Sequence, residues 1–118
     1  MKTAESNRLI AEFMNLPKVE CNISTEEGIV TEGYMHRLVG VPVTSDGMQY
    51  AYSWDWLMTV VEKISTIDNY VYSVKINYCI TYIETEHLDV ICNEQGNETI
   101  EATYKAVVEF IKWYNENK

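Results

Sequence analysis

The sequence predicts an α+β fold in which three helices pack on a mainly antiparallel sheet of about four strands. Apolar residues recur at helical spacing over residues 3–15 and 54–65, and again from about residue 99 onward. Between these segments apolar and polar residues alternate, most clearly over residues 70–82, as expected for strands. The links between the predicted strands are short, which favours antiparallel pairing and the order α-β-β-α-β-β-α.

The composition fits one globular domain spanning residues 1–118, with 47% hydrophobic residues, enough for a core without metal or disulfide. The three cysteines are far apart and form no CxxC pair, which argues against a zinc ribbon or a disulfide framework. We expect Cys79 and Cys92 to be buried free thiols. The formal charge of −9 argues against broad electrostatic capture of nucleic acid or of an anionic membrane surface.

The location expected for the protein is the cytoplasm. The first ten residues contain no apolar stretch and carry Glu5 and Arg8, unlike a signal peptide. No apolar run approaches the ~18–20 residues of a membrane-spanning helix.

The first half of the chain predicts one helix and two strands. The helix is expected from Thr3 to Asn15, since the residue before a proline avoids the helical region. Alternation over residues 19–23 predicts a strand, and residues 29–43 predict an irregular strand with a bulge near Gly40. Residues 44–47 have the composition of a turn.

The second helix is expected to run from about Trp54 to Ser65. Ser53 is the expected N-cap, and Asp55 follows in the first turn, where a carboxylate favours the positive end of the helix dipole. One apolar face is predicted, formed by Trp54, Leu57, Met58, Val61 and Ile64.

The alternation over residues 70–82 predicts a long strand that bends, or turns near Asn77, because strands usually have ~3–10 residues. Ile76 and Tyr78 are expected to point the same way as Tyr72, Val74 and Ile80, under the second and third helices. A further strand is predicted over residues 88–92. The last helix follows, with a stripe of Ile100, Tyr104, Val107, Ile111 and Tyr114.

Three segments resemble the phage ABA sandwich domain family of small phage and prophage proteins: NRLIAEFM (7–14), SWDWLM with VVEKI (53–58 and 60–64), and IEATYKAVVEFIKWYN (100–115). Thr59 departs from the proline that many members carry, and the resemblance is weakest over residues 21–50. It implies α/β/α layering and a bacterial host. No catalytic signature accompanies the family.

The sequence contains no motif for catalysis, metal or cofactor binding. His36 and His87 do not form an HExxH or His-x-His pair, and neither a GxSxG elbow nor a Gly-rich phosphate loop occurs. Glu84, Glu86 and Asp89 lack calcium-loop spacing. We therefore expect a protein that is not an enzyme and holds no metal or cofactor.

The candidate binding site is an aromatic run at the start of the second helix. It consists of Tyr50, Tyr52, Trp54, Asp55 and Trp56, with Arg37 nearby as a group that grips carboxylate or phosphate. Packing in the core is the more common role of such aromatic residues, and the same holds for Trp113 and Tyr114. Trp56 is expected to be partly exposed, since it lies off the predicted apolar face.

The favoured function is a phage accessory protein that binds a host factor, for example in counter-defence, as the resemblance implies. The alternative is a protein that binds or sequesters a small nucleotide-like signal, with aromatic rings for stacking. A DNA mimic is less favoured, because the acidic residues do not form runs. One uncovered sheet face also predicts a homodimer.

Overall fold

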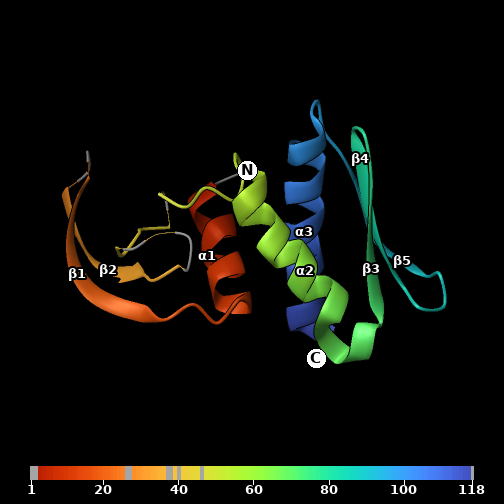
Figure 1. Cartoon of the computed structure of the whole chain (residues 1–118), viewed down its shortest axis with the longest axis horizontal. Coiled ribbons are helices and arrows are strands. Elements are labelled where there is room, and N and C mark those ends of the chain that lie inside the picture. Colours follow the sequence, from red (N-terminus) through yellow and green to blue (C-terminus); the bar gives the residue numbers. More distant parts are fainter. Residues whose placement is uncertain (1–2, 26–27, 37–38, 40, 46, 118) are drawn as a thin grey trace. The chain divides into compact units, whose positions relative to one another are not determined.

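The computed structural model describes residues 3–25, 28–36, 39, 41–45 and 47–117. It has the predicted α+β class, with three helices and five antiparallel strands in this part of the chain (Figure 1). The elements are α1 (Thr3–Phe13), β1 (Lys18–Thr25), β2 (Gly28–Tyr34), α2 (Trp54–Tyr70), β3 (Tyr72–Asn77), β4 (Ile80–Thr85), β5 (Val90–Gln95) and α3 (Thr99–Asn117).

The described strands form two sheets instead of the single sheet of about four strands that was predicted. β1 pairs with β2, and a separate sheet has the order β3-β4-β5. The predicted order of elements lacks one strand, because the segment predicted as one long strand is the hairpin of β3 and β4. The chain forms two compact units, Met1–Met48 and Gln49–Lys118. That both belong to one domain stays a prediction.

In the first unit, α1 ends in a Schellman motif built on Asn15. Asn15 adopts the left-handed conformation, with φ of 55°. The N–H of Leu16 donates to the carbonyl oxygen of Ala11 at 3.0 Å, and the N–H of Asn15 donates to that of Glu12 at 3.1 Å. α1 therefore ends at Phe13, two residues before the predicted end at Asn15 and ahead of Pro17.

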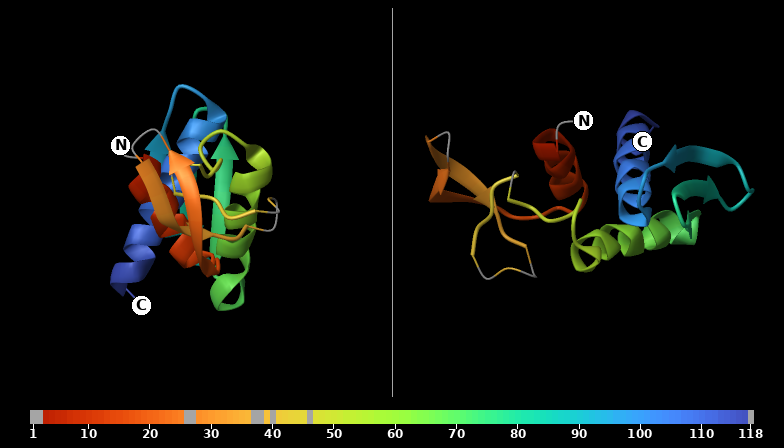
Figure 2. Two further views of the ribbon diagram at one scale, coloured as in Figure 1. Left: turned by 90° about the vertical axis from the view of Figure 1, so that its left-hand side faces the viewer. Right: turned by 90° about the horizontal axis from the view of Figure 1, so that it is seen from above.

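β1 and β2 form a strongly twisted two-stranded ribbon (Figure 2). The register shifts between Glu20 and Ile23, so that residues 21 and 22 of β1 lie opposite Thr31 alone. Such a β-bulge increases the local twist of the strand that carries it. The bulge predicted near Gly40 falls outside the described residues.

A buried asparagine attaches the loop that follows β2 to α1. Asn7 is fully buried, and its Nδ2 donates to the carbonyl oxygens of Ser45 at 2.8 Å and Met48 at 3.4 Å. The loop contains the predicted turn, in which the N–H of Gly47 donates to the carbonyl oxygen of Thr44 at 3.0 Å. The amide of Asn7 thus takes the place of a backbone donor for the buried carbonyl group of Met48 and the partly buried carbonyl group of Ser45.

In the second unit, α2 and α3 lie on the same face of the β3-β4-β5 sheet (Figure 1). α3 packs on β4 and β5, whereas α2 packs on β3. Fully buried side chains of this unit include Leu57, Ile64, Ile83, Val107 and Ile111. Within residues 49–117 no helix covers the opposite face, so the unit has two layers. The α/β/α layering stays an expectation of the resemblance.

The turn between β3 and β4 reverses the alternation of side chains. Asn77 pairs with Ile80, so only two residues form the turn. Paired residues share a face of the sheet, and Val74 pairs with the fully buried Ile83. Even-numbered residues of β3 and odd-numbered residues of β4 therefore face the helices. The predicted assignment of side chains to the two faces of the sheet is correct up to Asn77 and reversed from Ile80 onward.

Ile76, Tyr78 and Ile80 are not covered by the helices, which corrects the prediction for all three. Ile76 shares a face with Tyr72 but is 37% exposed, because α2 meets β3 near the other end of the strand (Figure 1). Tyr78 lies in the turn with φ of 50° and is 78% exposed. Ile80 is 38% exposed on the face away from the helices, which it shares with Tyr82.

The start of α3 is attached to the hairpin at two points. The buried hydroxyls of Thr81 and Thr103 are 2.9 Å apart, and Thr103 Oγ1 donates to the carbonyl oxygen of Thr99. Thr81 must therefore donate to Thr103. At the hairpin turn, the N–H of Gly96 donates to the carbonyl oxygen of Cys79 at 2.9 Å. These bonds align the first turn of α3 with β4.

Candidate functional site

The predicted site lies at the start of α2, which begins where the sequence predicts. In the turn over residues 49–53, two backbone N–H groups donate to the carbonyl oxygen of Gln49 at 3.0 and 2.8 Å. Ser53 then occupies the N-cap position in an extended conformation, without a capping bond from its side chain. The first helical bond runs from the N–H of Leu57 to Ser53, and Asp55 lies in the first turn.

Tyr50 and Trp56 belong to the core of the second unit. Tyr50 is fully buried and Trp56 is only 7% exposed, which contradicts the predicted partial exposure of Trp56. Their rings meet edge to face, with centroids 5.1 Å apart. Burial raises the pKa of the Tyr50 phenol, because it disfavours the phenolate. Both rings therefore pack in the interior at the start of α2.

The other side of α2 carries exposed apolar and acidic side chains. Trp54 and Met58 stand four residues apart on one side of the helix and are 39% and 43% exposed. Tyr52, just before the helix, is 75% exposed. Asp55 and Glu62 are exposed on the same side. We call these five residues (Tyr52, Trp54, Asp55, Met58 and Glu62) the α2 outer face.

The predicted site is therefore only partly assembled. Three of its residues, Tyr52, Trp54 and Asp55, lie on the α2 outer face, while two others are core residues. Arg37 lies outside the described residues. The sequence did not identify Met58 and Glu62 as surface residues. The predicted apolar face of α2 was centred about one residue away from the face that is buried in the structure. The helical spacing of Trp54, Met58 and Glu62 is the signal that would have found them.

A second aromatic cluster joins the end of α3 to β3. The rings of Tyr72, Phe110, Trp113 and Tyr114 pack with centroid distances from 5.0 to 6.3 Å. The Tyr114 hydroxyl donates to Asp68 Oδ1 at 3.4 Å. Burial and then the Asp68 carboxylate raise the pKa of Tyr72 and of Tyr114. Rings this close contact one another directly, so the cluster is packing, the more common role expected for Trp113 and Tyr114.

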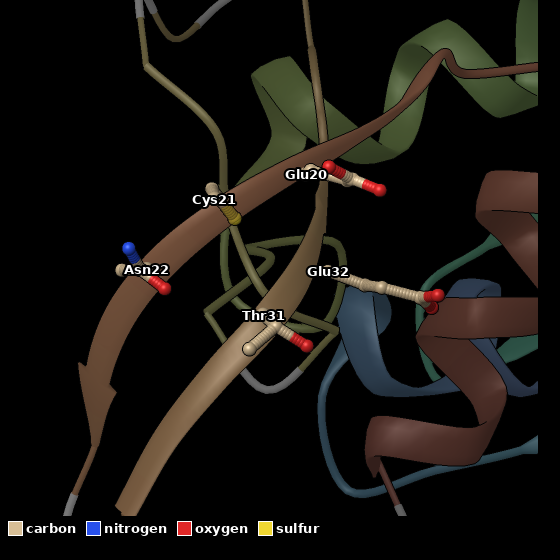
Figure 3. A pocket seen from close by; sticks show the side chains of 5 residues that line it. All are labelled: Glu20, Cys21, Asn22, Thr31 and Glu32. Atoms are coloured by element: carbon tan, nitrogen blue, oxygen red, sulfur yellow. The ribbon is translucent and has the colours of Figure 1, made fainter.

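An open groove of about 400 Å³ follows the bulge of the β1–β2 ribbon (Figure 3). Glu20 and Glu32 form a cross-strand pair, and both side chains extend to the same side. Cys21 belongs to the other face, where its Sγ would lie 3.0 Å from a Cβ placed on Gly33. Two adjacent carboxylates repel each other and any anion, so the groove does not favour a nucleotide.

The titratable groups do not assemble a metal or catalytic centre in the described part of the chain. No three His, Cys, Asp or Glu side chains there are placed to hold a metal ion. His87 is exposed beside Glu86, at 3.7 Å. Burial, with a smaller effect of Glu94, raises the pKa of the Cys92 thiol to about 12, so this cysteine is a poor nucleophile. Among the same residues, no helix is long and apolar enough to cross a membrane.

No protein-family model, curated protein or solved structure matches this chain. The assignment of function therefore depends on the surfaces of the molecule itself.

Proposed function

We propose that this protein is a non-enzymatic binding protein that recognises a partner protein through the α2 outer face. The observation that carries the proposal is the joint exposure of Trp54 and Met58 on one side of α2, with the exposed Tyr52 just before the helix. Large aromatic and methionine side chains are enriched at protein interfaces and are the usual anchors of binding energy. Their position on a helix whose other side is buried gives them a rigid support.

The chemistry of the α2 outer face specifies what partner would fit. Trp54 and Met58 present apolar surface, and Asp55 and Glu62 flank it with negative charge. An apolar groove with a rim of lysine or arginine residues is complementary to this arrangement. The second unit carries five basic and eleven acidic residues, which adds a long-range attraction to such a partner.

We further propose that the partner is a host factor and that the protein is a phage accessory protein acting in the bacterial cytoplasm, for example in counter-defence. This part of the proposal rests on the sequence resemblance to small phage proteins. The alternative, a small nucleotide-like ligand stacked on aromatic rings, is less favoured. Two of the four rings that it would use, those of Tyr50 and Trp56, are buried.

Affinity capture from a bacterial lysate tests the proposal. The full chain is compared with a double variant, Trp54→Ala with Met58→Ala, and with a matched double variant at two exposed apolar residues outside both proposed surfaces, Ile29→Ala with Leu88→Ala. We expect a protein that the native chain and the matched variant retain and that the Trp54/Met58 variant loses. The purified pair should then show at least about a tenfold weaker Kd for that variant. Equal binding by both double variants contradicts the proposal.

The homodimer remains a separate proposal, with the uncovered face of the β3-β4-β5 sheet as its interface. Ile80, Tyr82 and Val90 lie on this face, and Ile80 and Val90 are 38% and 55% exposed. Light scattering at high micromolar concentration should show a dimer, and Tyr82→Glu should convert it to a monomer. A monomer at all concentrations contradicts this proposal.

A further inference from the structure

A polar pocket of about 450 Å³ lies within the first unit, in a region distinct from the α2 outer face. α1 lines it with Ala4, Arg8 and Glu12, which stand four residues apart and so share one side of the helix. The strands and the loop after β2 complete the wall. Its volume lies in the range of about 300–1,000 Å³ that is typical of small-molecule sites.

The pocket contains two cationic groups. Arg8 is exposed and forms no ion pair with a described residue, so its guanidinium fork is available to a carboxylate or phosphate. The Lys18 ammonium lies 3.9 Å from the Glu32 carboxylate and 6.0 Å from the centre of the Tyr34 ring. Tyr34 is only 6% exposed, and its ring offers the Lys18 ammonium group a weak cation–π contact. The Lys18 side chain is 60% exposed and only loosely paired, so its ammonium group remains accessible to a ligand.

Hydroxyl groups stand on the loop side of the pocket. Thr44 Oγ1 accepts a hydrogen bond from the N–H of Gly47 at 3.2 Å, which leaves the hydroxyl proton of Thr44 to be donated elsewhere. Ser45 contributes a second hydroxyl, and its backbone is held in place by the bond from Asn7. These groups add neutral donors to the two cations.

The carboxylates of Glu12 and Glu32 balance the two cations, and this balance decides the class of ligand. A purely anionic ligand such as a nucleotide would meet both carboxylates and be repelled. A ligand that carries one anionic and one ammonium group satisfies both signs. We propose that this pocket binds an amino-acid-like zwitterion, with its carboxylate at Arg8 and its ammonium group at Glu12.

The test uses the ¹⁵N-labelled full chain and the twenty free amino acids, each added alone, with the dipeptide L-alanyl-L-alanine as a larger zwitterion. At least one of these probes should shift the amide signals of residues 8, 12, 18, 44 and 45 with a Kd below about 10 mM. N-acetylation or carboxyl amidation of that probe should abolish the shifts, because each modification removes one of the two charges.

Variants then assign the two charges to residues. Arg8→Gln and Glu12→Gln should each weaken binding at least about tenfold. The controls Glu5→Gln on α1 and Lys75→Gln on β3 lie outside the pocket and should leave the Kd unchanged. Both target residues are exposed, so the amide spectrum of each variant should otherwise match that of the native chain.

Three results would overturn the proposal. The first is that no probe shifts the pocket amides. The second is equal binding of the N-acetylated form. The third is binding of inorganic phosphate or AMP that becomes tighter in Glu12→Gln, since it would show a site for anions. None of these results bears on the α2 outer face, so the two proposals fail or stand separately.

Discussion

The rings of Tyr50 and Trp56 meet edge to face, with centroids 5.1 Å apart and planes inclined at 89°. Tyr50 lies in the turn before α2 and Trp56 in the first turn of the helix, so the contact joins two consecutive segments of chain. Edge-to-face packing adds stabilisation beyond the buried area alone. The pair therefore anchors the start of α2 and leaves Trp54, two residues earlier, on the surface.

Trp56→Ala should destabilise the protein by about 3–5 kcal/mol, because it removes a large buried ring and leaves a cavity beside Tyr50. Urea unfolding followed by circular dichroism measures this change. Trp54→Ala is the matched control and should cost less than about 1 kcal/mol, since its side chain is 39% exposed. Equal costs for the two variants would falsify the assignment of Trp56 to the core.

Asn7→Ala should destabilise the protein by about 1–3 kcal/mol. The substitution removes the donor to Ser45 and Met48, which leaves a buried carbonyl group at Met48 and a partly buried one at Ser45 without this partner. Amide hydrogen exchange should accelerate over residues 44–48, and urea unfolding should give the change in free energy. Asn93→Ala, at an exposed position of β5, is the control and should change neither measurement. Unchanged exchange over 44–48 in Asn7→Ala contradicts the role given to Asn7.

Gly96→Ala should destabilise the protein by about 1–3 kcal/mol, although Gly96 has an ordinary backbone conformation. A Cβ on this residue would lie 2.8 Å from the backbone nitrogen of Ala102, and this clash forces the start of α3 away from the hairpin. Gly47→Ala is the control, because its Cβ would meet its nearest neighbour at 3.4 Å. Thermal unfolding compares them, and a Tm for Gly96→Ala equal to that of Gly47→Ala contradicts the prediction.

Stability should fall as the pH rises above about 9. Burial raises the pKa of the Cys92 thiol from 9.0 to about 12, and burial also raises that of Tyr50. Between pH 9 and about 12 the folded state binds more protons than the unfolded state, so the free energy of unfolding decreases as the pH rises. Below about pH 9 the stabilising contribution of the protonated thiol is fully present. Urea unfolding at several alkaline pH values measures the slope.

Cys92→Ala should make the slope of the unfolding free energy against pH shallower. Tyrosines whose pKa values are also raised should account for the slope that remains in this variant. Native Cys92 should also react slowly with iodoacetamide at pH 8 and rapidly once the protein is unfolded, because only the thiolate reacts. An identical slope in the variant, or fast alkylation of native Cys92, would show that the thiol is not shielded by burial.

The sequence predicted most of the local structure, because local structure depends on spacing and on turn residues. The start of α2 at Trp54, the end of α1 before Pro17 and the turn over 44–47 all follow from such signals. The hairpin of β3 and β4 was harder to predict. Its apolar residues alternate through the turn without interruption, although the face they belong to changes at Tyr78.

The candidate site was only partly predictable, because burial depends on partners that are distant or follow no pattern. A helical face can be drawn through Trp54 or through Trp56, and the contact with Tyr50 decides between them. The pocket of Arg8 and Lys18 has no sequence motif at all, since α1 and β1 supply one cation each. Only the spacing of Arg8 and Glu12 on one helical side indicates that they act together.

The two-residue turn of the β3–β4 hairpin makes the second unit sensitive to chain length at one point and tolerant at another. Inserting one residue between Asn77 and Ile80 would turn β4 over, so that Ile80 and Tyr82 would replace Thr81 and Ile83 against α3. The connection between β4 and β5 tolerates more variation in length, because the register shift at Ile83/Glu84 already accommodates an extra residue in β5. Natural insertions and engineered tags in this unit therefore belong at residues 86–89 and not at the hairpin turn.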